Sequence, residues 1–390
     1  MRVTHVITRL IVGGAQENTI ATVLGLRRLP GWDVRLLSGP SEGPEGSLAA
    51  EFTTAAPDAL AIIPALTRPL HPWKDWVALR QLTSHFRTAR PDLVHTHSGK
   101  AGVLGRLAAA RAHVPIIVHG IHGPSFGPFQ GRFANWLLRS AELYAARVTT
   151  HFVSVADAMT RQYQAAGIGR PEQYTTIRSG FDLQPFLTAT NDPALRSRLR
   201  LGTDDFVVGK IARLFKLKGH DDLFTIAPEL VKRCPRIKFL LVGDGSWRER
   251  FERKAMAMNL RDRFVFTGLV PPAEIPRLVG VMDVIVHLSL REGLPRALPQ
   301  ALAAGKPVVA YDCDGAGEVC ISGKTGFLVR PRDLADLTSR LLQLAEDPAL
   351  RDQQGRQGRE LVREQFSVEK LVEDQRRLYL RLWQATKERG

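Results

Sequence analysis

The stretch from Leu288 to Cys320 reads LSLREGLPRALPQALAAGKPVVAYDCDGAGEVC, and it indicates the fold class more clearly than the rest of the chain. The apolar, β-branched run 284–288 predicts a buried strand, and apolar residues at helical spacing over 294–304 predict a helix. Gly305-Lys306-Pro307 ends that helix, and Val308-Val309-Ala310 is the next predicted strand. A strand, a helix and a strand of these lengths are typical of a parallel α/β sheet.

Glu292 and Gly293 lie in the loop that joins the first of these strands to the helix. Open α/β sheets bind their ligands beyond the carboxyl ends of the strands, which is where this loop is expected. Gly293 permits close approach of a ligand to the backbone, and amides at the start of the helix can bind an anion or a sugar oxygen. The alternative is that Glu292 only stabilises the N-terminus of the helix, and the local sequence leaves both interpretations open.

A longer motif resembles a known family. E-G-L-P-x-A-L begins at Glu292, and A-x-A-A-G-K-P-V-V-A begins at Ala301. Together they resemble the nucleotide-sugar half of family 4 glycosyltransferases, which have the GT-B fold. That family carries a Glu-x7-Glu pair, in which the first Glu faces the donor sugar and phosphate and the second holds the ribose hydroxyls. In this chain the second position is Gln300. The donor-binding residues that the resemblance implies here are Glu292, Gly293, Leu294, Pro295 and Gln300.

The remainder of the chain repeats the alternation of strands and helices. Residues 1–180 hold predicted strands and helices in turn, a linker with the turn Asn191-Asp192-Pro193 follows, and a second alternating series begins at Val207. With the resemblance, this predicts an α/β fold of the GT-B type: two Rossmann-like, doubly wound domains that face a cleft. The expected domains are 1–180 on the acceptor side and 181–367 for the nucleotide sugar. The resemblance implies that the last helix, 368–390, packs back on the first domain.

Composition narrows the class of protein. The chain has 390 residues, of which 44% are hydrophobic and 24% charged, and these values suit two globular domains better than a disordered protein. It contains no run of about 18 apolar residues that could span a bilayer, and its N-terminus predicts a strand and a Gly loop rather than a secretion signal. The three cysteines have no CxxC spacing, which is typical of reduced residues in a cytoplasmic protein.

The net charge of +15 indicates an acidic partner, such as nucleic acid, anionic lipid or a phosphorylated substrate. The basic excess is spread over both halves, without a Lys/Arg block or an aromatic-basic stripe, so nucleic acid is the least favoured of the three.

A membrane contact is one hypothesis for the helix predicted over 129–147. Its large apolar side chains share one stripe, with Arg132 and Arg139 beside it. The stripe consists of Phe129, Phe133, Trp136, Leu137 and Tyr144. The favoured interpretation is a helix that faces the core, and the other is an interfacial helix that meets an anionic membrane.

Arg213 and Lys218 stand in GKIARLFKLKGHDDL, between a predicted buried strand and the next helix. Two cations in one such loop can neutralise a diphosphate, although a solvated basic loop would show the same charges. The spacing R-x4-K-G matches the family, in which this pair stabilises the leaving nucleoside diphosphate. The Gly13-Gly14 loop is not GxGxxG, so a nicotinamide site is disfavoured. It resembles the family's first-domain loop beside the donor phosphates.

Histidines gather between residues 95 and 122, at His95, His97, His113, His119 and His122. A metal site is not favoured, because no carboxylate or cysteine accompanies them at ligand spacing. His122 matches the family's His-Gly loop, in which the imidazole contacts the hydroxymethyl group of the donor sugar, whereas His119 is expected to be structural. The segment HTHSGKAG also resembles the family, and it makes Ser98 and Lys100 candidates to face the acceptor, unless they are ordinary surface loop residues.

The resemblance implies a retaining glycosyltransferase that moves a hexose from a nucleotide diphosphate sugar to a hydroxyl of a glycan, a lipid-linked acceptor or a small molecule. The expected catalytic residues are Glu292, His122, Arg213 and Lys218, and Gly13 and Gly14 are expected to help bind the donor. No cofactor and no metal are expected, because the two cations replace a metal.

Two alternative classes remain. One is a GT-B nucleotide-sugar epimerase or an inactive homologue, and the other, less favoured, is a basic nucleic-acid-binding protein. We expect the protein in the cytoplasm, and peripheral contact with the inner face of an anionic membrane is left open.

Overall fold

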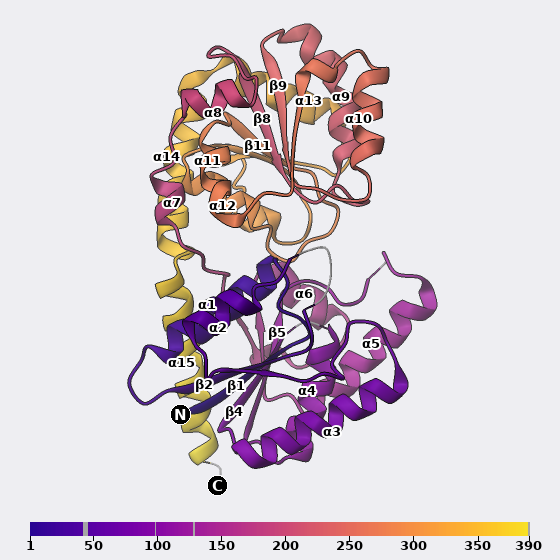
Figure 1. Ribbon diagram of the computed structural model, residues 1–390, viewed down its shortest axis with the longest axis vertical. Coiled ribbons are helices and arrows are strands. Elements are labelled where there is room, and N and C mark those ends of the chain that lie inside the picture. Colours follow the sequence, from indigo (N-terminus) through magenta and orange to yellow (C-terminus); the bar gives the residue numbers. More distant parts are fainter. Residues whose placement is uncertain (42–45, 98, 128, 389–390) are drawn as a thin grey trace. The chain divides into compact units, whose positions relative to one another are not determined.

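The computed structural model describes residues 1–41, 46–97, 99–127 and 129–388. The chain divides into two compact units, Met1–Phe181 with Ser367–Gly390, and Asp182–Phe366. Each unit contains a parallel sheet with helices on its faces (Figure 1). The predicted α/β class with two Rossmann-like sheets is confirmed.

The sheet of the first unit has the strand order β3-β2-β1-β4-β5-β6-β7, so the order reverses between β1 and β4. Its strands are β1 (Arg2–Ile7), β2 (Asp33–Ser38), β3 (Leu60–Ile62), β4 (Leu93–His97), β5 (Ile116–Ile121), β6 (His151–Ser154) and β7 (Tyr174–Thr176). The helices of this unit are α1 (Gly14–Arg27), α2 (Ala49–Ala55), α3 (Pro72–Ala89), α4 (Gly99–Arg111), α5 (Arg132–Ala146), α6 (Asp157–Ala165) and α15 (Val368–Lys387). A 3₁₀ turn spans Pro171–Gln173.

The sheet of the second unit repeats this topology, with the order β10-β9-β8-β11-β12-β13 and a reversal between β8 and β11. Its strands are β8 (Phe206–Ile211), β9 (Ile237–Val242), β10 (Phe264–Gly268), β11 (Val284–His287), β12 (Val308–Tyr311) and β13 (Gly326–Val329). Its helices are α7 (Gln184–Leu187), α8 (Pro193–Arg198), α9 (His220–Arg233), α10 (Arg248–Ala257), α11 (Ile275–Gly280), α12 (Ala297–Ala303), α13 (Leu334–Glu346) and α14 (Pro348–Gln365). Three 3₁₀ turns are described at Arg261–Arg263, Pro272–Glu274 and Asp314–Glu318.

Helices on both faces explain why the residues of the central strands are buried on both sides of the sheet. In the first unit, Val3 and Leu93 pack on the face covered by α1 and α15, whereas Val6 and Val94 pack on the face covered by α3 and α4. Every residue of β4 is buried, including its two histidines. A buried polar side chain destabilises the folded state unless it is hydrogen-bonded, so the histidines of β4 are expected to have hydrogen-bond partners.

Two short elements, β3 and α2, are absent from the sequence prediction, because their residues are few and mostly half-buried or exposed. The predicted helix over 294–304 is shorter, since α12 starts at Ala297. The backbone before α12 is hydrogen-bonded to the segment after β12. The Glu292 amide donates to Asp314 Oδ2 at 2.6 Å, and the Gly315 amide donates to the Gly293 carbonyl at 3.0 Å. These two bonds keep residues 292–296 in a loop.

The prediction for 129–147 is wrong in two respects. Helix α5 starts at Arg132, so Phe129 precedes it. The stripe predicted to face the core is exposed, with Phe133 at 75% and Trp136 at 62%. The helix packs instead through its opposite side, where the buried Glu142 accepts a hydrogen bond from Arg106 of α4 at 2.6 Å. A buried ion pair therefore fixes which side of α5 faces the protein.

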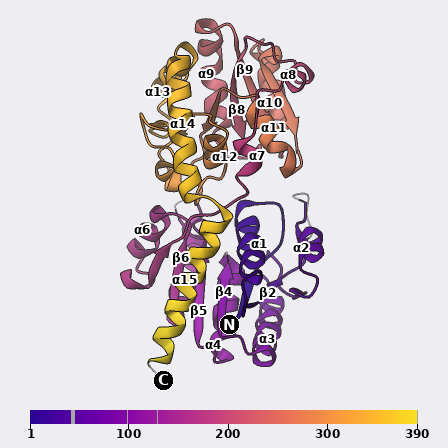
Figure 2. The same cartoon turned by 90° about the vertical axis from the view of Figure 1, so that its left-hand side faces the viewer.

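Helix α15 belongs to the first unit, where it lies along one sheet face next to α1 (Figure 2). The two helices approach closely because α1 has a glycine at the crossing: a Cβ added to Gly25 would lie 2.2 Å from Cγ2 of Val372. Valine is stiff at χ1, so it has little freedom to move aside.

We expect Gly25→Ala to destabilise the protein by about 1–3 kcal/mol, through overpacking against Val372. In the background Val372→Ala the same change should instead stabilise by about 0.5–1 kcal/mol, because alanine is the better helix former. Thermal or urea unfolding of the two single variants and the double variant measures this sign reversal. Equal effects in both backgrounds would contradict the contact between α1 and α15.

Candidate active site

Lys218 and Glu292 form an ion pair at the carboxyl edge of the second sheet. The Lys218 ammonium donates to Glu292 Oε1, and about a fifth of each side chain remains exposed. Lys218 lies in the loop after β8 and Glu292 in the loop after β11, the neighbouring strands at which the order reverses. In doubly wound sheets this is the position where ligands bind.

The two loops touch through their backbones as well. The Leu290 amide donates to the Leu217 carbonyl at 2.9 Å. Gly219, which precedes α9, has a φ of 67°, and a Cβ there would lie 2.0 Å from the carbonyl oxygen of Leu288. Only glycine fits a left-handed position with that little space, so Gly219 is required for Lys218 to reach Glu292.

The charge of Glu292 is set by opposing effects. Burial raises the pKa of its carboxyl. The positive charge of Lys218, and then the neighbouring His287, lower that pKa by more than burial raises it, so the pKa of Glu292 lies below the ordinary value. The distance between His287 Nε2 and Glu292 Oε1 is 3.7 Å. Glu292 is therefore an anion at neutral pH, and Lys218 is its principal counter-ion.

Lys210 is a further titratable group of this region that the sequence prediction missed. It lies inside β8, is 1% exposed, and its Nζ has no hydrogen-bond partner within the described residues. Burial, and then the charge of Lys218, lower its pKa to about 7. The available signal was a lysine within the apolar strand VVGKI. Asp314, which accepts a hydrogen bond from the Glu292 amide, was also not among the predicted residues.

Arg213 follows β8 in the same loop as Lys218, but it does not join the ion pair. The residue is exposed, and its guanidinium lies 5.2 Å from the centre of the Phe215 ring. Over the described chain it forms no ion pair, which leaves its charge available to a ligand. Of the other predicted donor-binding residues, Gly293 and Pro295 are buried in the loop after Glu292, while Leu294 and Gln300 are half-buried.

The remaining predicted residues belong to the first unit. Gly13 and Gly14 lie at the start of α1, as predicted, and the Gly13 carbonyl accepts from the Glu17 amide at 3.0 Å. His122 follows β5, and its Nε2 lies 2.9 Å from Nδ1 of His97. Ser98 lies outside the described residues.

Lys100 has a structural role that its sequence context did not reveal. Its ammonium donates to the carbonyls of Thr67 and Pro69, at 2.7 and 2.5 Å, and forms an ion pair with Asp75 of α3. Only 8% of its side chain is exposed. Three acceptors saturate the three ammonium protons, so Lys100 joins α4 to the segment before α3 rather than facing an acceptor.

The histidines are divided between the two faces of the first sheet. His119, expected to be structural, hydrogen-bonds Thr96 Oγ1 at 3.0 Å on the α4 side. His95 and His97 lie on the α15 side, where they meet His5 of β1, a neighbour that the sequence prediction did not include. One ring nitrogen from each of these three residues lies within 4.8 Å of one ring nitrogen of each of the others. His113 is exposed and lies apart, after α4.

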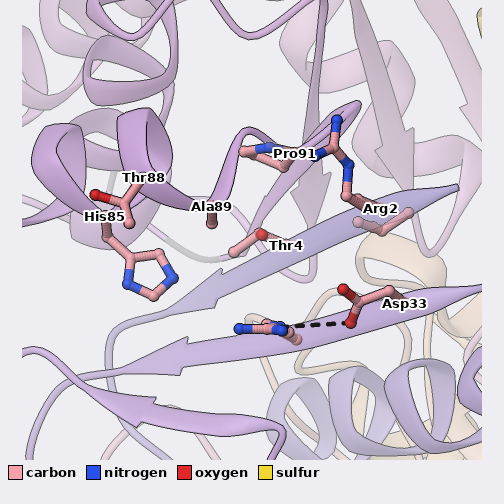
Figure 3. A pocket seen from close by; sticks show the side chains of 9 residues that line it. Arg2, Thr4, Asp33, His85, Thr88, Ala89 and Pro91 are labelled. Carbon is pink, nitrogen blue, oxygen red and sulfur yellow. Dashed lines mark hydrogen bonds and ion pairs between the residues drawn. The ribbon is translucent and has the colours of Figure 1, made fainter.

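A separate pocket of about 410 Å³ lies at the amino edge of the same sheet (Figure 3). It is lined by the first residues of β1 and β2 and the end of α3: Arg2, Val3, Thr4, Asp33, Arg35, His85, Thr88, Ala89 and Pro91. Arg2 is paired with Asp92 at 3.3 Å, and Arg35 with Asp33 at 3.4 Å. Both arginines of the pocket are already paired with carboxylates. The pocket also lies at the amino ends of the strands, whereas ligands of such sheets bind at the carboxyl ends, so it is not a candidate for the donor site.

Comparison with known proteins identifies the family. The model described as "Glycosyl transferases group 1" matches residues 191–361, and the model described as "Glycosyl transferase 4-like domain" matches residues 13–180. The chain belongs to the family 4 type of glycosyltransferases. This confirms the resemblance seen in the sequence.

Relatives of this glycosyltransferase act on different sugars. The UDP-Gal:alpha-D-GlcNAc-diphosphoundecaprenol alpha-1,3-galactosyltransferase of Escherichia coli is 28% identical over 74% of this chain and 75% of its own length. The GDP-mannose-dependent alpha-(1-6)-phosphatidylinositol monomannoside mannosyltransferase of Mycolicibacterium smegmatis is 33% identical over 63% of this chain and 64% of its own. Among solved structures, Anabaena HepE in complex with UDP and glucose has a TM-score of 0.81 at 23% identity, covering 97% of this chain and 99% of that chain, which shows a shared fold.

Lys218→Met should raise the pKa of Glu292 in this glycosyltransferase from below to above its ordinary value, because burial then acts without the principal counter-ion. A carbon-13 NMR titration of the labelled carboxyl groups measures the shift, with Glu292→Gln to assign the signal. Arg213→Met is the matched control in the same loop and should leave this pKa in place. A Glu292 pKa that is the same in the wild type and in Lys218→Met would contradict the ion pair.

Proposed function

We propose that this glycosyltransferase moves a hexose from a nucleotide diphosphate sugar to an acceptor hydroxyl, with retention of anomeric configuration and without a metal. The observation that carries the proposal is the Lys218–Glu292 pair at the switch point of the second sheet, with the unpaired Arg213 in the same loop. One anion and two cations at a ligand-binding edge suit a polyhydroxylated, doubly charged donor.

Lys218 can serve two partners at once. Its ammonium has three protons, of which one is directed to Glu292, so the others can be donated to diphosphate oxygens. Glu292 thereby orients the cation before the donor arrives. Arg213 adds a planar fork that suits phosphate oxygens. As the bond between the anomeric carbon and the phosphate oxygen breaks, negative charge grows on the diphosphate, and preorganised cations stabilise it.

The remaining steps follow from the same arrangement. The leaving phosphate oxygen takes the proton of the acceptor hydroxyl on the face from which it departs, and the acceptor oxygen bonds to the anomeric carbon on that face, which gives retention. His122 contacts a sugar hydroxyl in this proposal. Gln300 replaces a carboxylate near the ribose, where neutral hydrogen bonds of about 1 kcal/mol each would hold the diol.

We further propose that the acceptor is held at an anionic membrane, and that α5 meets that membrane. Phe133, Trp136 and Tyr144 form an exposed stripe on α5, and Arg147 lies over the Tyr144 ring at 5.9 Å. The acid of the helix, Glu142, is buried in its pair with Arg106. The exposed side therefore joins aromatic rings with basic charge and lacks acids, which suits anionic lipid head groups.

Two further observations bear on the membrane hypothesis. Within the described residues no helix is long and apolar enough to span a bilayer. The Escherichia coli and Mycolicibacterium relatives carry lipid-linked acceptors in their names.

The donor proposal predicts that Lys218→Ala and Arg213→Ala each lower turnover on the order of 100-fold or more, since each removes one preorganised charge. The donor is first found by a thermal-shift screen of UDP, GDP and ADP sugars. Transfer to acceptor is then measured in buffer that contains EDTA, where the wild type should keep its activity. Lys232→Ala, at the far end of α9 and exposed, is the control and should retain wild-type turnover.

Three results would contradict the donor proposal: near-normal transfer by both variants, a loss of wild-type activity in EDTA that a divalent ion restores, or epimerised donor without an acceptor product. The first would remove the diphosphate assignment, the second the metal-free mechanism, and the third the transfer reaction itself.

The membrane proposal predicts that Phe133→Ser/Trp136→Ser lowers partitioning onto vesicles of mixed neutral and anionic lipid by about tenfold or more, because two large aromatic groups leave the interface. Sedimentation with vesicles measures it, and added salt should weaken the binding of the wild type. Leu269→Ser, which changes a 65% exposed residue of the other unit, is the control. Binding that is unaffected by the double change would exclude α5 as the contact.

A further inference from the structure

The helices on one face of the first sheet carry a concentrated positive charge. α3 and α4 cover that face, and α5 packs beside α4 (Figure 1). The three helices contain eight Lys or Arg residues and two Asp or Glu residues, a net charge of +6. α1 and α15, which cover the other face, contain six basic and four acidic residues, a net charge of +2. The fold therefore gathers on one side a charge that is distributed along the sequence.

Both acids of α3, α4 and α5 are already paired with cations of α4. Asp75 of α3 forms an ion pair with Lys100, and Glu142 of α5 forms one with Arg106. The six remaining basic residues of these helices are exposed, and none of them forms an ion pair with a described residue. They are Lys74, Arg80, Arg87, Arg111, Arg132 and Arg139. The outer surface of the three helices is therefore positive.

α3 also exposes two tryptophans at its N-terminal end. Trp73 is 66% exposed and Trp76 is 45% exposed. The two indole rings stack with their centres 4.9 Å apart, and the guanidinium of Arg80 lies 4.6 Å from the centre of the Trp76 ring. Contacts with a ring and with a cation hold the Trp76 side chain in place. Adjacent exposed apolar side chains, unlike single ones, mark a surface for a partner.

A pocket of about 670 Å³ extends from Trp76 along α3 to the end of α4. Three guanidinium groups line it, from Arg80 and Arg87 of α3 and from Arg111 of α4. Arg87 donates to the Arg111 carbonyl at 3.2 Å, so the two helix ends are joined there. Among the described residues that line this pocket there is no carboxylate. Guanidinium groups bind phosphate oxygens through paired N–H donors, so the pocket suits a phosphate group.

The aromatic and basic side chains lie along one side of α3. Positions 73, 76, 80, 84 and 87 are three or four residues apart, so they form one line along the helix. The line begins with two indole rings and continues with guanidinium groups. An interfacial helix has this character, because indole rings lie near the boundary of the acyl chains while arginines reach the lipid phosphates.

Nucleic acid is another polyanion that is bound by aromatic and basic side chains together. Proteins that bind single strands offer separate aromatic rings, on which successive bases stack. On α3 the two rings stack on each other instead, and Trp76 also contacts Arg80. This arrangement favours a lipid surface over a nucleic acid.

We propose that α3 binds the surface of an anionic phospholipid bilayer. Trp73 and Trp76 lie among the head groups, and the three guanidinium groups of the pocket hold the phosphate of one lipid. The inference rests on the membrane contact in the proposed function and deepens it, because it adds a second helix and a phosphate pocket to the contact assigned to α5. It uses no residue of the candidate active site.

Sedimentation of the full chain with vesicles of phosphatidylcholine and phosphatidylglycerol tests the aromatic part of this surface. We expect Trp73→Ser/Trp76→Ser to lower partitioning onto these vesicles by about tenfold or more, because two indole rings leave the interface. Both side chains are exposed, so the melting temperature should stay close to that of the wild type. Partitioning equal to that of the wild type would overturn the proposal.

Arg87→Gln/Arg111→Gln tests the pocket, because it removes two of the three cations and keeps good helix formers. Lys74→Gln/Arg139→Gln is the matched control, which removes two exposed charges from the same helices outside the pocket. We expect partitioning onto the mixed vesicles to fall at least about threefold further for the pocket variant than for the control, since paired N–H donors bind phosphate more strongly than diffuse charge does. An equal fall in the two variants would refute the phosphate pocket.

A labelled single-stranded oligonucleotide takes the place of the vesicles in a second measurement. We expect no binding by the wild type at physiological salt. Binding that both the tryptophan and the arginine variants weaken would identify nucleic acid as the partner and overturn the proposal.

Phe133→Ser/Trp136→Ser, measured beside these variants, separates the inference from the proposed function. Weaker vesicle binding by this α5 variant, with wild-type binding by the α3 variants, would leave the proposed membrane contact in place and refute the role of α3. The reverse result would support α3 and refute the contact assigned to α5. No donor or acceptor sugar is present in these measurements, so neither result depends on sugar transfer.

Discussion

The ion pair between Lys218 and Glu292 is the interaction around which the second unit is arranged. A partly buried carboxylate is costly without a counter-ion, and the removal of either partner would leave the other charge uncompensated. The chain meets this constraint with two local contacts. Gly219 lets the two loops touch, and Asp314 accepts a hydrogen bond from the Glu292 backbone amide. Together these residues hold the charges of Lys218 and Glu292 at the place where the strand order reverses.

The two sheets share a topology and differ in the chemistry of their switch points. At β8 and β11 the loops carry charged groups close to solvent, which suits a ligand with charge. At β1 and β4 the polar groups are imidazoles inside the strands, fully buried and neutral. The same fold thus supplies a charged site in one unit and an uncharged hydrogen-bonded network in the other. The difference follows from where the polar residues lie, beyond the strand ends or within the strands.

The errors of the sequence prediction have physical causes that a linear pattern does not contain. The aromatic stripe of α5 has the periodicity of a core-facing helix, yet the buried pair of Arg106 and Glu142 turns the opposite side inward. Lys100 resembles a loop residue, but its ammonium is saturated by acceptors from segments about 25 to 33 residues away. The helix expected from Leu294 starts at Ala297, because hydrogen bonds from the segment after β12 hold the loop before it. In each case a partner distant in sequence outweighed the local preference.

The sequence by itself determined the α/β class, the parallel order of strands and helices, the family, and the loops in which Gly13, Arg213, Lys218 and Glu292 lie. Hydrophobic periodicity and turn residues are recognised within short segments of the sequence, so these features can be predicted without knowing which distant residues meet. Only the tertiary structure decided which side chains meet: that Lys218 pairs with Glu292 while Arg213 does not, and that His5 and Tyr379 join His97 and His122. Such contacts depend on strand register and on helix packing across the sheet, where a shift of one residue turns a side chain to the other face.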